Sequence, residues 1–149
     1  MDRTLGVARI GSSAHGPNSG GRAEYVPGVC NIGPAEIARR RRSGWIGLIA
    51  TAVLWATLVA LDAPPLLRLL TFFPAAMAAA GFLQAAMHFC AYFGFSSLFN
   101  LGPEVGKTDS VEEAEFRKQD RRKAWQIVGY SVAVGLSVAV AASALYATP

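Results

Sequence analysis

The stretch "SGWIGLIATAVLWATLVAL", residues 43–61, contains no Asp, Glu, Lys or Arg. Residues 69–102 and 124–149 share this property. In a helix, about 20 such residues cross a hydrocarbon core of roughly 30 Å. A surface helix of a soluble protein normally carries charges along one face, and these stretches carry none. The 149-residue chain is therefore predicted to be an all-α integral membrane protein with three transmembrane helices.

The predicted membrane domain covers residues 34–149. Pro34 suits the first turn of a helix, so a helix is expected to begin there and to continue into the first span. Pro74 should kink the second span near Leu70, because proline removes a main-chain hydrogen bond. The spans are expected at about residues 43–62, 69–94 and 124–147, with a cytoplasmic loop or helix at 100–123.

The basic residues predict the orientation of these spans. Nine of them lie in the short flanks directly before the first and third spans, whereas the short loop after the first span has only Arg68. Because cytoplasmic flanks are enriched in Lys and Arg, the N-terminus is predicted to be cytoplasmic and the C-terminus outside. The nine are Arg39, Arg40, Arg41, Arg42, Arg117, Lys118, Arg121, Arg122 and Lys123.

Residues 1–33 have a different composition. They are rich in Gly, Ser and Pro without sustained periodicity, so a flexible cytoplasmic segment is expected. They also lack the apolar run of a signal peptide. A multi-pass protein of a bacterial inner membrane is the simplest interpretation.

The four consecutive arginines before the first span allow two interpretations. Arg39, Arg40, Arg41 and Arg42 would spread around a helix at the lipid surface. Near an anionic leaflet each contributes about 1 kcal/mol. They are interpreted first as topology determinants; a site for anionic lipid headgroups or for a partner is the sharper alternative.

Small and polar residues of the second span are candidate packing contacts. Gly81 and Ala85 would permit close approach of a neighbouring helix. Gln84 and His88 are four residues apart, so they are expected on one helical face, turned toward protein or water. A hydrogen bond from one of them to a serine of the third span is the expected structural role.

Cys30 and Cys90 are candidate reactive thiols. Both are expected on the cytoplasmic side, where a nearby arginine would lower a thiol pKa. Against this, a reducing cytoplasm keeps cysteines reduced, and a cysteine in an apolar helix is more often a packing residue. His88 and Cys90 would diverge by about 200° around a helix, so they could share a metal ion only if the helix broke between them.

No cofactor is predicted. Zinc usually needs four ligands, and besides these residues only Cys30, His15 and carboxylates are available. The stretch "GPEVGKT", residues 102–108, has one residue too few between its glycines for a phosphate-binding loop, so no nucleotide site is expected. Ser110 and Glu113 form a predicted capping box for a helix that continues into the third span. The bases of that helix serve topology, so nucleic acid is not an expected partner.

One family resemblance rests on the second span and its flanks. From about Arg41 to Asn100, the pattern of bases, span, short turn and the ending "GFLQAAMHFCAYFGFSSLFN" resembles a small two-span inner-membrane domain of unknown function, found alone or fused to rhodanese domains. Ala91 replaces a proline that usually follows the cysteine. The resemblance implies a self-associating helical hairpin and a link to sulfur handling. The matching positions are Phe89, Cys90, Tyr92 and Gly94.

Two classes of function follow. The first is a non-catalytic structural or accessory subunit that packs with itself, as a homo-oligomer, or with a larger membrane complex. The second is a membrane thiol-redox or persulfide-handling protein that uses Cys30 and Cys90. A transporter is disfavoured because three spans scarcely enclose a pore.

Overall fold

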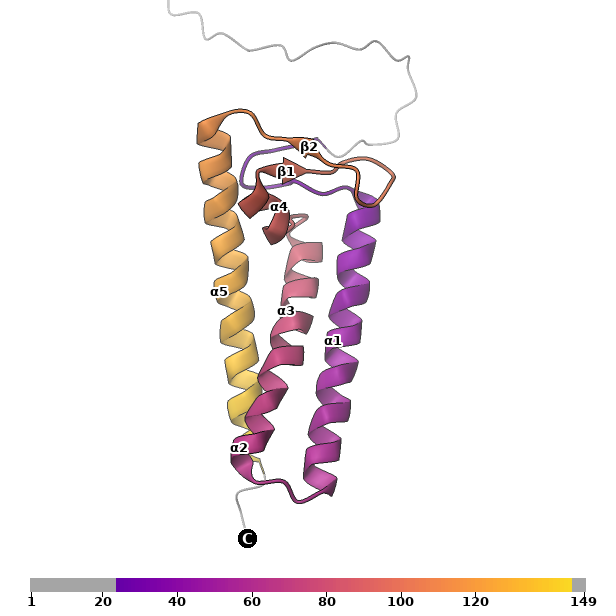
Figure 1. Ribbon diagram of the computed structural model, residues 1–149, viewed down its shortest axis with the longest axis vertical. Helices are drawn as coiled ribbons and strands as arrows, with labels where there is room; N and C mark the ends of the chain where they lie inside the picture. The colour runs from indigo at the N-terminus through magenta and orange to yellow at the C-terminus, as the bar shows by residue number, and fades with distance from the viewer. Residues whose placement is uncertain (1–23, 146–149) are drawn as a thin grey trace, which may run out of the picture.

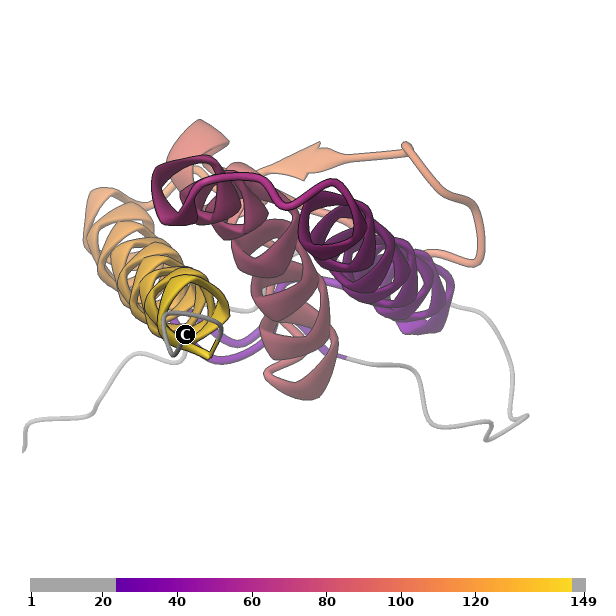
Figure 2. The same cartoon turned by 90° about the horizontal axis from the view of Figure 1, so that it is seen from below.

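The computed structural model describes residues 24–145, and the predictions made for residues 1–23 lie outside this range. Its long helices are α1 (Pro34–Ala60), α3 (Phe72–Ala86) and α5 (Ala114–Ala144). Helix α3 lies between the other two and packs against both, as Figures 1 and 2 show. The first and last of these helices therefore form the outer members of the bundle.

The predicted fold class is confirmed at the level of secondary structure. The described chain is mostly helical, and three helical segments are long and apolar enough to cross a membrane. These segments are Pro34–Ala60, Pro65–Ala86 and Ala114–Ala144.

Proline determines two helix starts and one interruption. Pro34 is the first residue of α1, as predicted, and Pro65 is the first residue of the short helix α2 (Pro65–Arg68). A 3₁₀ turn, η1 (Leu69–Thr71), separates α2 from α3. This break lies where Pro74 was expected to kink the span, because Pro74 has no N–H to donate to the carbonyl of Leu70.

Glycines allow α1 and α3 to approach closely. A Cβ atom added to Gly81 would overlap the backbone of Gly44, and one added to Gly47 would lie 2.6 Å from the main-chain nitrogen of Ala78. The predicted packing role of Gly81 is thus filled by a helix of the same chain. On the other side of α3, a Cβ atom on Gly135 of α5 would lie 2.8 Å from the Cβ of Ala76.

The second span is shorter than predicted. Helix α3 ends at Ala86, not near residue 94, and His88 adopts a left-handed φ of 51°. The side chain of Gln84 explains this end, because its Oε1 accepts a hydrogen bond from the N–H of Ala91 at 3.0 Å. The chain then re-enters a short helix, α4 (Ala91–Ser96).

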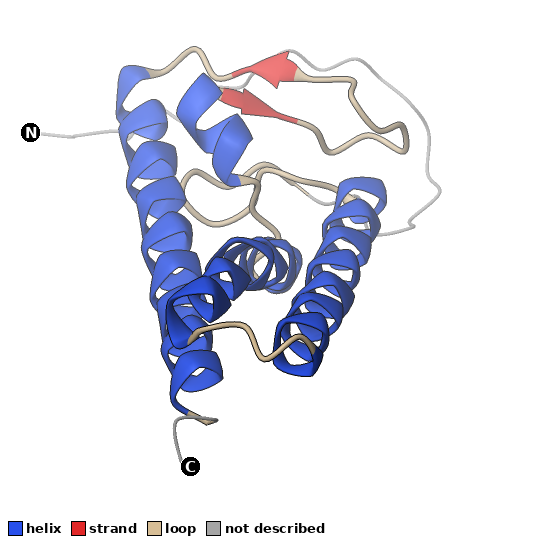
Figure 3. Ribbon diagram, turned by 60° about the horizontal axis from the view of Figure 1, so that its bottom comes forward, coloured by secondary structure: helices blue, strands red, loops and turns tan. Residues whose placement is uncertain are grey.

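A small non-helical layer covers this end of the bundle. The strands β1 (Leu98–Phe99) and β2 (Asp109–Ser110) pair antiparallel, with Leu98 opposite Ser110 (Figure 3). The predicted capping box is therefore wrong, because Ser110 lies in β2. Helix α5 begins at Ala114 with Glu113 as its N-cap residue, and no side chain caps it.

Ordered structure begins before the predicted boundary at residue 34. Ile32 pairs with Asn100 in a parallel bridge, and both Asn31 and Ile32 are fully buried. Composition indicated flexibility up to residue 33, but residues 24–33 lie against the loops that follow α3. Their order comes from these long-range contacts, which composition does not report.

Candidate functional site

Buried polar side chains gather at the end of the bundle where α1 and α5 begin. We call this region the polar cap, and Figure 1 shows it at the top of the molecule. Each of its side chains makes a hydrogen bond or ion pair to a segment of the cap. Its members are Asn31, Glu36, Gln84, Asn100 and Asp120.

Asn31 holds the turn after α3 against the segment before α1. Its Nδ2 donates to the carbonyl oxygen of Cys90 at 3.1 Å, and its Oδ1 accepts from the N–H of Cys90 at 2.7 Å. Its own N–H donates to the carbonyl of His88 at 3.2 Å, and its carbonyl accepts from the N–H of Asn100 at 2.9 Å. One buried residue thus satisfies main-chain groups of three others, as buried polar groups require.

Glu36 is a fully buried carboxylate on the first turn of α1. Its Oε1 accepts a hydrogen bond from the N–H of Gly106 at 3.2 Å. Its Oε2 lies 3.6 Å from Nη1 of Arg39 and 3.8 Å from Nη2 of Arg40. The carboxylate therefore fixes the loop between β1 and β2 to α1 and balances part of the arginine charge.

Asp120 is a second buried carboxylate, and it fixes the segment before α1 to α5. Its carboxylate accepts from the hydroxyl of Tyr25 at 2.8 Å and from the N–H of Gly28 at 2.7 Å. Burial, together with the hydrogen bond and negative charge of Asp120, raises the pKa of Tyr25 well above its usual range. The ring of Tyr25 also stacks on Phe99, with centroids 4.8 Å apart. Both outer helices thus bind the cap through a buried acid.

Cys90 lies inside this cap, fully buried, as the N-cap residue of α4. Nη2 of Arg40 donates to its Sγ at 3.0 Å. Burial nevertheless raises the pKa of the Cys90 thiol, although Arg40 and the N–H groups of Phe93 and Tyr92 oppose that change. The arginine approaches as the thiol hypothesis required, but desolvation outweighs it.

Cys30 is partly exposed and also free. Its Sγ lies 3.7 Å from the carbonyl oxygen of Ile32, and burial raises the pKa of this thiol as well. A raised pKa leaves little thiolate at neutral pH, and the thiolate is the reactive form. Burial therefore disfavours the thiolate form of both cysteines.

The polar residues predicted on one face of span two separate in the structure. Gln84 is buried and His88 is exposed on the turn beyond α3. Neither bonds a serine of α5: the Nε2 of Gln84 donates to the carbonyl of Ala80 at 3.0 Å, and the Oγ of Ser131 donates to the carbonyl of Ile127 at 2.7 Å. Ala85 is buried in the bundle. Helix α3 ends before both His88 and Cys90, yet residues 24–145 contain no cluster of three or more metal-ligating His, Cys, Asp or Glu.

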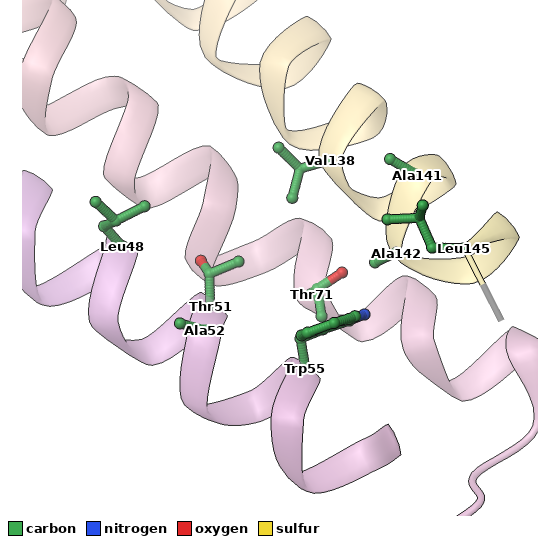
Figure 4. Close-up of a pocket in the computed structure, with 9 residues that line it drawn as sticks. All are labelled: Leu48, Thr51, Ala52, Trp55, Thr71, Val138, Ala141, Ala142 and Leu145. Atoms are coloured by element: carbon green, nitrogen blue, oxygen red, sulfur yellow. The ribbon is translucent and has the colours of Figure 1, made fainter. Parts of the chain in front are cut away.

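A second candidate site lies at the opposite end of the bundle, between α1 and α5. It is an apolar groove of about 340 Å³ whose side chains come from both outer helices (Figure 4). The indole Nε1 of Trp55 is buried there and has no hydrogen-bond partner within the described residues. We call it the interhelical groove; it is lined by Leu48, Thr51, Ala52, Trp55, Thr71, Val138, Ala141, Ala142 and Leu145.

A row of small residues on α5 leads into this groove. Gly129, Ala133, Ser137 and Ala141 recur at every fourth position and are all exposed. A Cβ atom added to Gly129 would meet nothing within 4 Å. Ala141 also lines the interhelical groove. The sequence showed that the third span is rich in small residues, but only the structure separates this outer row from the inner residues that contact α3.

Comparisons with known proteins leave the family open. No protein family, curated protein or solved structure gives a significant match to the chain. The resemblance to the two-span domain therefore stays a hypothesis.

Proposed function

We propose that the chain is a small non-catalytic integral membrane protein that acts as a structural or accessory subunit. It crosses a bacterial inner membrane three times, with its N-terminus in the cytoplasm. It packs with a second copy of itself or with a helix of a larger membrane complex. The buried polar residues of the cap support this proposal, because they are bonded to structural partners instead of converging on a substrate space.

The observation that carries the proposal is the continuity of the outer row of α5 with the interhelical groove. Small residues at every fourth position let another membrane helix approach closely, and packing replaces hydrophobic drive within a bilayer. The groove beside Ala141 is apolar and accepts side chains of such a helix. A neighbouring helix could also supply an acceptor for the indole N–H of Trp55.

The test places larger side chains in the outer row of α5 and leaves the residues that pack against α3 unchanged. Ala133→Leu and Ser137→Leu should obstruct a close helix, since overpacking costs about 1–3 kcal/mol. Val53→Leu on the exposed face of α1 is the control. Gently solubilised protein is compared for particle mass and co-purifying proteins. Loss of a second copy or of a partner in the α5 variants alone supports the proposal. Equal retention in all variants, or a wild-type protein that is a single chain without partners, contradicts it.

A thiol-based function is the second candidate, because Arg40 contacts Cys90. A Cys30→Ser variant leaves Cys90 as the only thiol, and its alkylation by a maleimide can be followed in membranes against pH. Since burial raises the pKa of Cys90, we expect slow labelling at neutral pH that accelerates only as the solution becomes alkaline. Rapid labelling at neutral pH that is lost in Arg40→Gln would instead favour the thiol function.

A further inference from the structure

A basic groove lies on the outer face of α1, beside the polar cap. Its volume is about 620 Å³, which exceeds that of the interhelical groove. Two arginines and a serine form part of its wall, and aliphatic side chains form the rest. It is lined by Ala35, Ala38, Arg39, Arg42, Ser43, Ile46 and Val105.

The buried carboxylate of Glu36 does not line this groove but holds the loop that forms one of its walls. Its hydrogen bond from the N–H of Gly106 holds the adjacent Val105 beside the first turns of α1. Val105 is half exposed although its backbone position is fixed in this way. The groove is therefore formed between a helix and a tethered loop.

The charge of the groove is positive. Arg39 and Arg42 are three residues apart and lie on the same side of α1. Arg39 pairs with Glu36 only at 3.6 Å, and its side chain is 58% exposed. Arg42 is exposed and makes no ion pair with any described residue. Guanidinium groups bind phosphate oxygens with several donors in a plane, so this pair suits a phosphate group.

An apolar path continues from the groove along α1. Ile46, Ile49 and Val53 follow Arg39 and Arg42 at alternating spacings of three and four residues, which keeps all five on one helical face. Their exposed fractions are 57%, 60% and 59%. Trp45, also exposed, lies one residue before Ile46, and exposed tryptophans concentrate at headgroup depth.

We propose that this groove binds an anionic phospholipid. The phosphate lies between Arg39 and Arg42, Val105 covers the headgroup, and one acyl chain follows Ile46, Ile49 and Val53. The groove combines cationic donors at one end with an apolar path at the other, as a lipid requires and a soluble phosphate does not. This site is independent of the packing face on α5.

The test is native mass spectrometry of the full chain in mild detergent with phosphatidylglycerol, phosphatidylcholine or glycerol 3-phosphate. Wild type should retain phosphatidylglycerol. The double variant Arg39→Gln/Arg42→Gln should lose at least about tenfold in retention, since each base near an anionic surface contributes roughly fivefold. The control Lys118→Gln/Arg121→Gln removes the same charge from exposed positions of α5 outside the groove, and it should bind as wild type does.

A second variant distinguishes loss of the lipid site from misfolding or altered membrane insertion caused by the removal of arginines. Val105→Asp adds a carboxylate to the groove from an exposed loop position and leaves every arginine in place, so it should also reduce retention. An equal loss of phosphatidylglycerol from the α5 control would show that retention depends on the general surface charge of the protein, and it would overturn the proposal. Equal retention of phosphatidylcholine would remove the requirement for an anionic lipid. Displacement of phosphatidylglycerol by glycerol 3-phosphate would assign the groove to a soluble phosphate and also contradict it.

Discussion

Asn31 and Asp120 show how single residues connect segments that are distant in the sequence. Asn31 bonds both main-chain groups of Cys90, and Asp120 bonds Tyr25 and Gly28. Removing a partner from a buried main-chain group typically costs about 1–3 kcal/mol. Residues 24–33 are therefore part of the folded domain and not a tether in front of it.

The bond between Tyr25 and Asp120 predicts a dependence of stability on alkaline pH. The folded protein raises the pKa of Tyr25 above its ordinary value of 10.0, so folding favours the protonated phenol. Its contribution is complete below pH 10.0 and declines as the pH rises toward the folded pKa. Thermal unfolding in detergent between neutral and strongly alkaline pH should show this loss in wild type.

Tyr25→Phe is the matched variant, because it keeps the ring that stacks on Phe99 and removes only the hydroxyl. It should be less stable than wild type at neutral pH, and the difference should shrink as the pH rises above 10.0. A stability difference between the two proteins that stays constant across this range would show that folding does not change the pKa of the Tyr25 phenol.

At the scale of elements, Gly81 of α3 and Gly129 of α5 have opposite roles. Gly81 abuts the backbone of Gly44, whereas Gly129 faces open space. Gly81→Ala should therefore destabilise the bundle by about 1–3 kcal/mol, because the helices must separate. Gly129→Ala should leave stability unchanged or raise it by about 0.5–1 kcal/mol, since alanine favours the helix.

Both substitutions add one methyl group to a membrane helix, so each controls for the other. Thermal unfolding in one detergent provides the comparison. A similar change in both variants would mean that the contact between α1 and α3 tolerates a side chain at Gly81, contrary to the close approach of Gly81 to Gly44.

The same elements show which features the sequence could predict. Pro34 and Pro74 act through local chemistry, so the start of α1 and the break before α3 follow from residue type alone. The end of α3 depends on the Gln84 side chain reaching the N–H of Ala91, seven residues away. The pairing of Asn31 with Cys90 spans 59 positions, and neither periodicity nor composition reports such a contact.

At the scale of the whole molecule, the two ends of the bundle differ, because the polar cap lies at one end only. The polar cap contains the segment before α1 and the connection from α3 to α5, whereas the opposite end has the short turn around α2. The predicted bases before the first and third spans lie on the helices that begin at the cap. Because the three consecutive helices alternate in direction, the first and the third begin at the same end of the bundle.

The remaining prediction is which end of the bundle faces the cytoplasm, and it rests on the unequal distribution of basic residues between the two ends. Nine basic residues lie on α1 and α5 near the end that carries the polar cap, and one, Arg68, lies at the other end. Because flanks rich in Lys and Arg stay in the cytoplasm, a reporter inserted near Lys107 should behave as cytoplasmic and one fused after Pro149 as periplasmic.

Alkaline phosphatase and a fluorescent protein, which are active on opposite sides of the membrane, provide paired measurements at both positions. The two measurements depend on each other, because the loop between β1 and β2, to which Lys107 belongs, and the C-terminal end of α5 lie at opposite ends of one bundle. Reversed signals at both positions would place the polar cap outside and leave the bundle intact. Equal signals at both would mean that one helix does not cross, and the three-span architecture itself would then be wrong.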